Sequence, residues 1–185
     1  VVICVGKGEN KMVKQTFKNL PSAKRRRIEA VLLEEFSTYP LADAKVSHIV
    51  KNANIARGAF YKYFDDLIDA YVYMYHIAIE DIHAGMSPNE KFDPNHFYAR
   101  VVKFIDKVQY SKYEPMMKLH MSQNEYLIPH NFKIYSRQLL NMGPQLWSAM
   151  VLSHEVINLC LSDPENQEKN LARYKKSLDI LAKGM

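Results

Sequence analysis

The sequence predicts an all-α protein with about nine helices, and three observations support this class. Apolar residues recur at spacings of three and four along most of the chain, whereas no convincing strand pattern is found. Helix-start signals such as Asp93-Pro94 and Asp163-Pro164 divide the chain into segments of helical length. A hydrophobic content of 48% over 185 residues is enough for one large helical domain or two small ones.

Charge divides the chain into two parts. Residues 1–64 hold 12 Lys or Arg and 5 Asp or Glu, a net charge of +7, whereas residues 65–185 hold 13 and 15, a net charge of −2. A basic first third on a slightly acidic remainder is typical of a protein that binds DNA at one end. No apolar run reaches the length of a membrane span, so we expect no membrane partner. Cys4 and Cys160 are isolated, which favours reduced thiols and a cytoplasmic protein.

The first 21 residues predict a flexible basic arm. Seven cations and no acid lie between Lys11 and Arg27. We interpret them as an arm that adds phosphate or minor-groove contacts, with a solvated leader as the alternative. Residues 1–11 are expected to be flexible or loosely docked, since Met12 is a second candidate for the start of the native chain.

A first helix is predicted from Ser22 to Thr38, with Ser22 as its N-cap and Pro40 enforcing its end. Its buried stripe is expected to hold Ile28, Val31, Leu32 and Phe36. Asp43 or Ala44 opens a second, short helix. The apolar face of that helix consists of Val46, Ile49, Val50 and Ala53.

The stretch from Lys45 to Phe64 predicts two short helices joined by a tight turn. Asn54 can take the left-handed conformation that the turn needs. The second helix covers about residues 56–63 and places Phe60 and Phe64 on its buried face. The rest of its surface carries residues with little or no side chain (Gly58 and Ala59), cations and a phenol. These features make the two short helices a candidate helix-turn-helix.

Residues 49–64 read IVKNANIARGAFYKYF. This order resembles the signature of TetR-family transcriptional regulators, which has an Ile, then Ala-Gly-Val, Ser-Lys-Gly-Thr and a closing Leu-Tyr-x-x-Phe. The resemblance covers about residues 25–72. Four positions depart from the family pattern: Asn54 for a Gly, Ala59 for a Thr or Ser, Ala44-Lys45 for hydroxyl residues, and Leu67 for a Lys. The missing hydroxyls and the missing Lys remove phosphate contacts that the resemblance would otherwise imply.

The resemblance implies a DNA-binding domain over residues 22–64 and a helical effector-binding and dimerisation domain over residues 65–185. Within the second short helix we expect Tyr61 to bind a phosphate through its phenol, Arg57 to reach a guanine and Lys62 to meet a phosphate. The alternative for Arg57 and Lys62 is an ordinary solvated face. The full set of expected DNA-binding residues is Arg25, Arg26, Lys45, Ala56, Arg57, Gly58, Ala59, Tyr61 and Lys62.

The remaining helices are expected over about residues 65–84, 94–109, 114–121, 124–141, 144–161 and 164–183. The first of these is apolar around much of its girth, so we expect it to be buried on more than one side and to link the two domains.

Aromatic and thioether side chains crowd the middle of the chain. We interpret them as an adaptable pocket for an apolar or aromatic effector, with plain core packing as the alternative. The named pocket residues are Tyr75, His76, Phe104, Met117, His120 and Trp147. His76, Glu80 and His83 share a helix face at a separation that a metal ion can bridge, but no fourth ligand is evident, so we expect no metal.

The last two helices carry apolar stripes that form either intramolecular core or, as the resemblance implies, a dimer interface. These stripes include Leu146, Met150, Ile157, Leu171, Tyr174, Leu178 and Leu181. No catalytic arrangement or Gly-rich phosphate loop stands out, so we expect neither an enzyme nor a cofactor.

The leading interpretation is a homodimeric repressor that binds a palindromic double-stranded DNA operator and is released by a small-molecule effector. One alternative is a TetR-like protein whose C-terminal domain binds a protein partner. The other is a helical enzyme or carrier.

Overall fold

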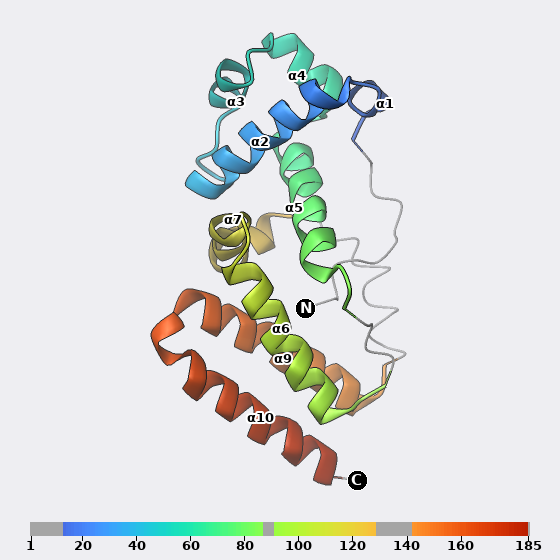
Figure 1. Ribbon diagram of the computed structural model, residues 1–185, viewed down its shortest axis with the longest axis vertical. Coiled ribbons are helices and arrows are strands. Elements are labelled where there is room, and N and C mark those ends of the chain that lie inside the picture. Colours follow the sequence, from blue (N-terminus) through green and yellow to red (C-terminus); the bar gives the residue numbers. More distant parts are fainter. Residues whose placement is uncertain (1–12, 87–90, 129–141, 185) are drawn as a thin grey trace. The chain divides into compact units, whose positions relative to one another are not determined.

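A computed structural model of the chain describes residues 13–86, 91–128 and 142–184 (Figure 1). Every regular element in these ranges is helical, as the sequence predicts. The described residues fall into two compact units. The N-terminal unit comprises residues 13–82 and 112–128, and the C-terminal unit comprises residues 83–86, 91–111 and 142–184.

The N-terminal unit contains the predicted helix-turn-helix together with helices from later in the chain. Its helices are α1 (Gln15–Lys18), α2 (Ser22–Thr38), α3 (Val46–Asn52), α4 (Arg57–Tyr63), α5 (Leu67–His83, of which only His83 belongs to the other unit) and α7 (Glu114–Leu119). A π-helical turn (His120–Asn124) and a 3-10 turn (Glu125–Leu127) extend α7. The sequence predicts a domain boundary after residue 64, and that boundary stays a prediction.

Two helix starts differ from the prediction. Pro21 rather than Ser22 is the N-cap of α2, because Pro21 is extended and Ser22 already belongs to the helix. The second short helix begins at Val46, with extended Lys45 as its N-cap, rather than at Asp43 or Ala44. The two residues predicted to open it instead form a turn, in which the amides of both donate to the carbonyl of Pro40.

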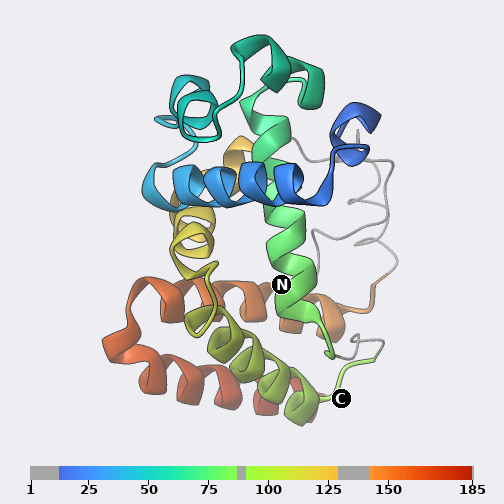
Figure 2. The ribbon, with the colours of Figure 1, turned by 45° about the horizontal axis from the view of Figure 1, so that its top comes forward.

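The described part of the predicted arm is docked rather than flexible. Phe17 in α1 is fully buried and Val13 nearly so. The centre of the Phe17 ring lies 4.9 Å from that of Phe64 and 5.3 Å from that of Tyr73, so aromatic contacts hold this part of the predicted arm against the protein. Helix α1 lies beside α4 (Figures 1 and 2). Residues 1–12 of the predicted arm lie outside the described residues.

The C-terminal unit consists of three helices that pack against one another (Figure 2): α6 (Pro94–Gln109), α9 (Pro144–Ser162) and α10 (Gln167–Lys183), the last preceded by a 3-10 turn at Pro164–Asn166. Asp93 caps α6 by accepting a hydrogen bond from the amide of His96 at 2.7 Å. The helix predicted over residues 124–141 falls mostly outside the described residues. None of the described helices has the length and apolar character required to cross a membrane.

Candidate nucleic-acid interface

Helices α3 and α4 form a helix-turn-helix whose turn has the predicted geometry. Asn54 lies in the left-handed region at φ 49°, which lets the chain reverse between the helices. Ile49 and Ala53 before the turn, and Phe60 and Phe64 after it, are fully buried. The burial predicted for these four positions is therefore confirmed, whereas Val46 and Val50, predicted on the same apolar face, are half-buried. Tyr63 of α4 is also buried, and the other residues of this helix are exposed or half-buried.

The exposed face of α4 carries four of the expected DNA-binding residues. Arg57, Gly58, Tyr61 and Lys62 are all exposed, and a Cβ added at Gly58 would meet no atom within 4 Å. The guanidinium of Arg57 lies 5.8 Å from the ring centre of Tyr61, and its Nη2 donates to the Tyr61 hydroxyl at 3.4 Å. The Arg57 cation and the Tyr61 phenol thus contact each other beside Gly58, which has no side chain. This arrangement is suited to contacts with DNA phosphates and base edges. Ala56, the N-cap of α4, is exposed and Ala59 is half-buried on the same helix.

The remaining expected DNA contacts lie on α2 and at the start of α3. Arg25 is engaged within the protein, because Nη1 donates to the carbonyl of Lys18 at 3.3 Å and Nε lies 3.7 Å from the Glu29 carboxylate. Arg26 is exposed on the same helix. Lys45 is exposed at the N-cap of α3.

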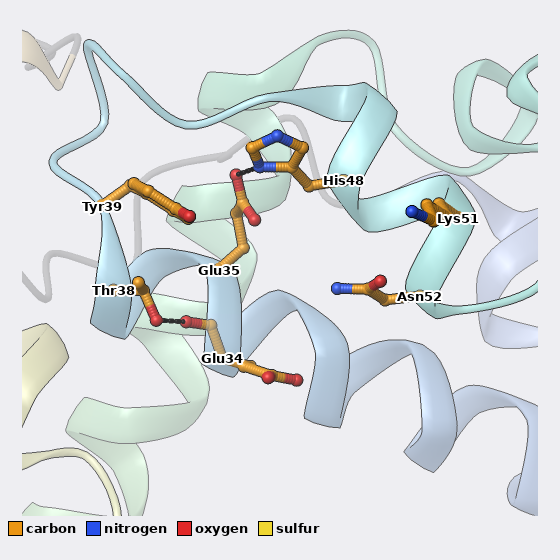
Figure 3. Close-up of a pocket in the computed structure, with 7 residues that line it drawn as sticks. All are labelled: Glu34, Glu35, Thr38, Tyr39, His48, Lys51 and Asn52. Carbon is orange, nitrogen blue, oxygen red and sulfur yellow. Dashed lines mark hydrogen bonds and ion pairs between the residues drawn. The ribbon is translucent and has the colours of Figure 1, made fainter.

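A buried carboxylate binds the backbone at the start of α3. Glu35 on α2 is only 4% exposed, and its Oε1 accepts a hydrogen bond from the amide of Lys45 at 2.7 Å. The same oxygen lies 3.2 Å from Nδ1 of His48 (Figure 3). Glu35 therefore fastens α3 to α2 and satisfies an amide at a helix start that has no cap of its own.

The space beside this pair is a cavity of about 230 Å³ between α2 and α3. Figure 3 shows that α2 contributes Glu34, Glu35 and Thr38, followed by Tyr39, while α3 contributes the other three side chains. Those three are His48, Lys51 and Asn52. The lining is polar and carries both signs of charge, unlike the apolar effector pocket that the sequence predicts.

The structure distributes the predicted effector-binding residues over both units. Tyr75, His76, Met117 and His120 lie in the N-terminal unit, where the rings of Tyr75 and His120 stack at 3.9 Å. Phe104 and Trp147 lie in the C-terminal unit, Phe104 buried and Trp147 45% exposed. The pocket they were expected to line stays a prediction.

His120 belongs to a buried polar network that the sequence analysis did not find. Its Nδ1 lies 3.1 Å from the hydroxyl of Tyr71, which also accepts a hydrogen bond from Nδ2 of Asn124 at 3.3 Å. The Oδ1 of Asn124 in turn accepts from the amide of Leu41, in the loop between α2 and α3, at 2.9 Å. Burial raises the pKa of the Tyr71 phenol above its ordinary range, so this hydroxyl stays protonated in the network.

Four of the predicted dimer residues are buried within their own unit. Ile157, Leu171, Tyr174 and Leu178 belong to the core of the C-terminal unit, which is the alternative that the sequence left open. Leu146, Met150 and Leu181 are half-buried. The exposed large apolar side chains of α9 and α10 are Trp147, Val151 and Ile180, at 45%, 44% and 70% exposure.

The metal alternative gains no support, because no group of three His, Cys, Asp or Glu side chains in the described ranges is arranged to hold a metal ion. Burial lowers the pKa of His76, which keeps that ring neutral over most of the physiological range.

The sequence analysis did not identify two side chains of the N-terminal unit, Glu35 and Lys14, although the sequence around each of them gives an indication. Glu35 is an acid on the buried face of α2, next to Phe36. Lys14 lies between Val13 and Phe17, two apolar residues that are both buried.

The fold is similar to several solved structures. A TetR family transcriptional regulator from Chloroflexus aurantiacus J-10-FL superposes with a TM-score of 0.55 at 21% identity, covering 94% of this chain and 98% of that one. A TetR transcriptional regulator from Rhodococcus sp. RHA1 gives a TM-score of 0.51 at 17% identity, with 88% and 98% covered. A further transcriptional regulator from Rhodococcus sp. Rha1 gives 0.53 at 14%, with 86% and 96% covered.

The likeness is one of structure, since no family model and no curated protein sequence matches the chain. It extends over most of the chain, beyond the residues 25–72 on which the sequence resemblance rests. The chain therefore has the fold of TetR-family transcriptional regulators.

Proposed function

We propose that the protein is a transcriptional regulator whose N-terminal unit binds double-stranded DNA through α4. The observation that carries the proposal is the outward face of α4, where Arg57 and Tyr61 contact each other beside exposed Gly58 and Lys62. The clustering of positive charge in the first 64 residues and the likeness of the fold to transcriptional regulators support it.

The regulator acts as a homodimer, because two copies of α4 must reach successive turns of a palindromic site. Its interface involves the exposed apolar residues of α9 and α10. Nε2 of Gln145 donates to the carbonyl of Leu181 at 3.1 Å, so the beginning of α9 lies beside the end of α10. Trp147 and Ile180 lie close to these two residues in sequence, which gathers exposed apolar surface at one end of the helix pair.

Repression and release by a small apolar or aromatic effector follow from the family resemblance. An effector can weaken DNA binding only if it binds more tightly to the conformer with the lower DNA affinity. Helix α5 and the α7 segment belong to the same unit as the helix-turn-helix, so a change at Tyr75 or His120 has a direct route to it.

The test is binding of the purified protein to its own promoter and to random DNA over a salt series, with three variants. Arg57→Ala is expected to lower the affinity about tenfold or more, because it removes a potential bidentate base contact. Tyr61→Phe is expected to lower it about threefold or more through loss of one hydrogen bond. Lys176→Ala removes an equal charge from the exposed surface of α10 and serves as the matched control.

Binding that is weak, unselective and unchanged in all three variants would show that α4 does not contact DNA. The dimer is tested separately by sedimentation of the Trp147→Ser, Ile180→Ser double variant, which is expected to be monomeric. Tyr110→Ser, which changes a side chain that is 91% exposed in the same unit, is expected to remain dimeric. A dimer that persists in the double variant would move the interface elsewhere.

A further inference from the structure

The last carbonyl groups of α4 have no hydrogen-bond donors within the helix. Residues from the beginning of the described chain supply these donors. An α-helix leaves its final carbonyls unsatisfied, and α4 ends at Tyr63 after only seven residues. The Nζ of Lys14 donates to the carbonyl of Tyr61 at 2.8 Å and to that of Phe64 at 3.4 Å. The amide of Lys14 donates to the carbonyl of Tyr63 at 3.1 Å.

The fourth carbonyl, that of Lys62, accepts a hydrogen bond from the hydroxyl of Thr16. Four consecutive carbonyls at the end of α4, those of residues 61–64, are therefore all bound by residues 14 and 16. A cation at this position also interacts favourably with the negative end of the helix dipole.

The segment that makes these bonds is anchored by its apolar side chains. Phe17 is fully buried, with its ring 5.5 Å from that of Tyr63 and 4.9 Å from that of Phe64. Val13 is 7% exposed. The anchor contacts the last residue of α4 and the one after it, so the polar and apolar contacts hold the same end of the helix.

The charge of Lys14 is already compensated. Its Nζ lies 2.9 Å from Oδ1 of Asp65, in addition to the two carbonyls that it contacts. A lysine held in this way has little charge left to neutralise a DNA phosphate. We therefore do not expect Lys14 to make the phosphate contacts that the run of cations predicts for the arm.

We propose that residues 13–17 are a clamp that sets the position of α4, and that Lys14 and Thr16 are positioning residues for DNA binding. The proposal rests on the proposed function, in which α4 contacts DNA. A helix of seven residues is not stable alone, so its orientation depends on what holds its ends. With the clamp released, the C-terminal end of α4 moves more freely and Arg57 and Tyr61 are less often aligned with their targets.

The experiment measures DNA affinity over a salt series for Lys14→Met, which keeps the aliphatic stem but removes the donor. We expect an affinity loss of about three- to tenfold, since a charge-assisted hydrogen bond is lost at a half-exposed site. The slope of log affinity against log salt should stay unchanged, because no phosphate contact is removed. Lys14→Arg, which keeps a charged donor, should recover most of the affinity.

Two further variants separate the clamp from general electrostatics. Thr16→Val removes a clamp hydrogen bond without changing charge and should also weaken binding, whereas Thr16→Ser should not. Lys24→Met removes a cation from the same basic run, on α2, and leaves the clamp hydrogen bonds of Lys14 and Thr16 in place. Any affinity that Lys24→Met loses should be accompanied by a smaller salt slope.

Amide hydrogen exchange of the DNA-free protein provides a readout that does not depend on the proposed function. Exchange at residues 60–64 should be faster in Lys14→Met than in the wild type, while exchange in α10 should be equal. Unchanged exchange at 60–64, or a Lys14→Met affinity loss with a salt slope reduced by about one, would overturn the clamp. If the wild type itself does not bind DNA selectively, the proposed function fails, and the exchange data alone decide whether the clamp holds α4.

Discussion

Replacement of Glu35 tests whether a carboxylate from α2 holds the first helix of the helix-turn-helix. Glu35→Ala removes the acceptor for the Lys45 amide at 2.7 Å and the partner of His48 at 3.2 Å. Loss of the hydrogen bond at the start of α3 costs about 1 kcal/mol, by analogy with loss of a helix cap, and loss of the part-buried bond to His48 adds about 1.5 kcal/mol. The relief of a desolvated carboxylate offsets part of this, so we expect the free energy of unfolding to fall by about 2 kcal/mol.

The assay is urea unfolding followed by far-ultraviolet circular dichroism and by the fluorescence of Trp147. Trp147 is the single tryptophan of the chain and lies in the C-terminal unit, whereas Glu35 lies in the N-terminal unit. The two signals therefore distinguish a local loss of helix from global unfolding. In Glu35→Ala the dichroism midpoint should move to lower urea, and DNA affinity should fall with it because α3 supports α4.

Two control variants bracket the result. Glu35→Gln keeps an oxygen acceptor for the Lys45 amide and should lose less than half as much stability as Glu35→Ala. Glu34→Ala changes the adjacent acid, which is exposed on the same cavity, and should stay within about 0.5 kcal/mol of the wild type. A stable Glu35→Ala variant, or equal losses for Glu34→Ala and Glu35→Ala, would refute the assignment of Glu35 as the cap of α3.

Three further predictions concern stability. Asn124→Ala leaves the buried Leu41 amide without its acceptor and removes one of the two hydrogen bonds of the Tyr71 hydroxyl, which keeps His120. Denaturant titration should report a loss of about 2–3 kcal/mol. Burial raises the pKa of Tyr174 to about 12, so the folded state keeps a proton that the unfolded chain releases above about pH 10. The free energy of unfolding should therefore fall as the pH rises from about 10 to about 12, and it should fall less steeply in Tyr174→Phe. Burial lowers the pKa of His76, so stability should fall as pH drops below about 6.5, and thermal melts of His76→Gln should remove that part of the acid dependence.

The helices of this protein could be predicted from local sequence signals, and several of their ends could too. Ser22–Thr38 has the predicted bounds, and α6 begins at Pro94 and ends at Gln109 as expected. Proline acts on its immediate neighbours, and an apolar stripe repeats within one helix, so both signals are readable in a short window. The left-handed turn at Asn54 belongs to the same class, because it depends on a single residue type.

The contacts that hold the candidate site could not be predicted in this way. Lys14 binds carbonyls 47 and 50 residues further along the chain, and Asn124 binds an amide 83 residues earlier. Such partners depend on the tertiary arrangement, and no periodicity within one segment reports them. The same limit explains why Ile157 and Tyr174 were offered as interface residues, since an apolar stripe does not say which surface covers it.

Most of what orients α4 lies away from the face that is proposed to contact DNA. The helix has seven residues, too few to be stable without its surroundings. Its beginning is set by the Asn54 turn and by α3, which Glu35 holds on α2, while its end is held by Lys14 and by the ring of Phe17. These hydrogen bonds and packing contacts favour one orientation of α4. Removing any of them lowers the fraction of molecules in which Arg57 and Tyr61 are aligned for binding. Apparent DNA affinity falls in proportion to that fraction, which means that substitutions in residues 14–17 or at Glu35 should weaken binding without removing a single DNA contact.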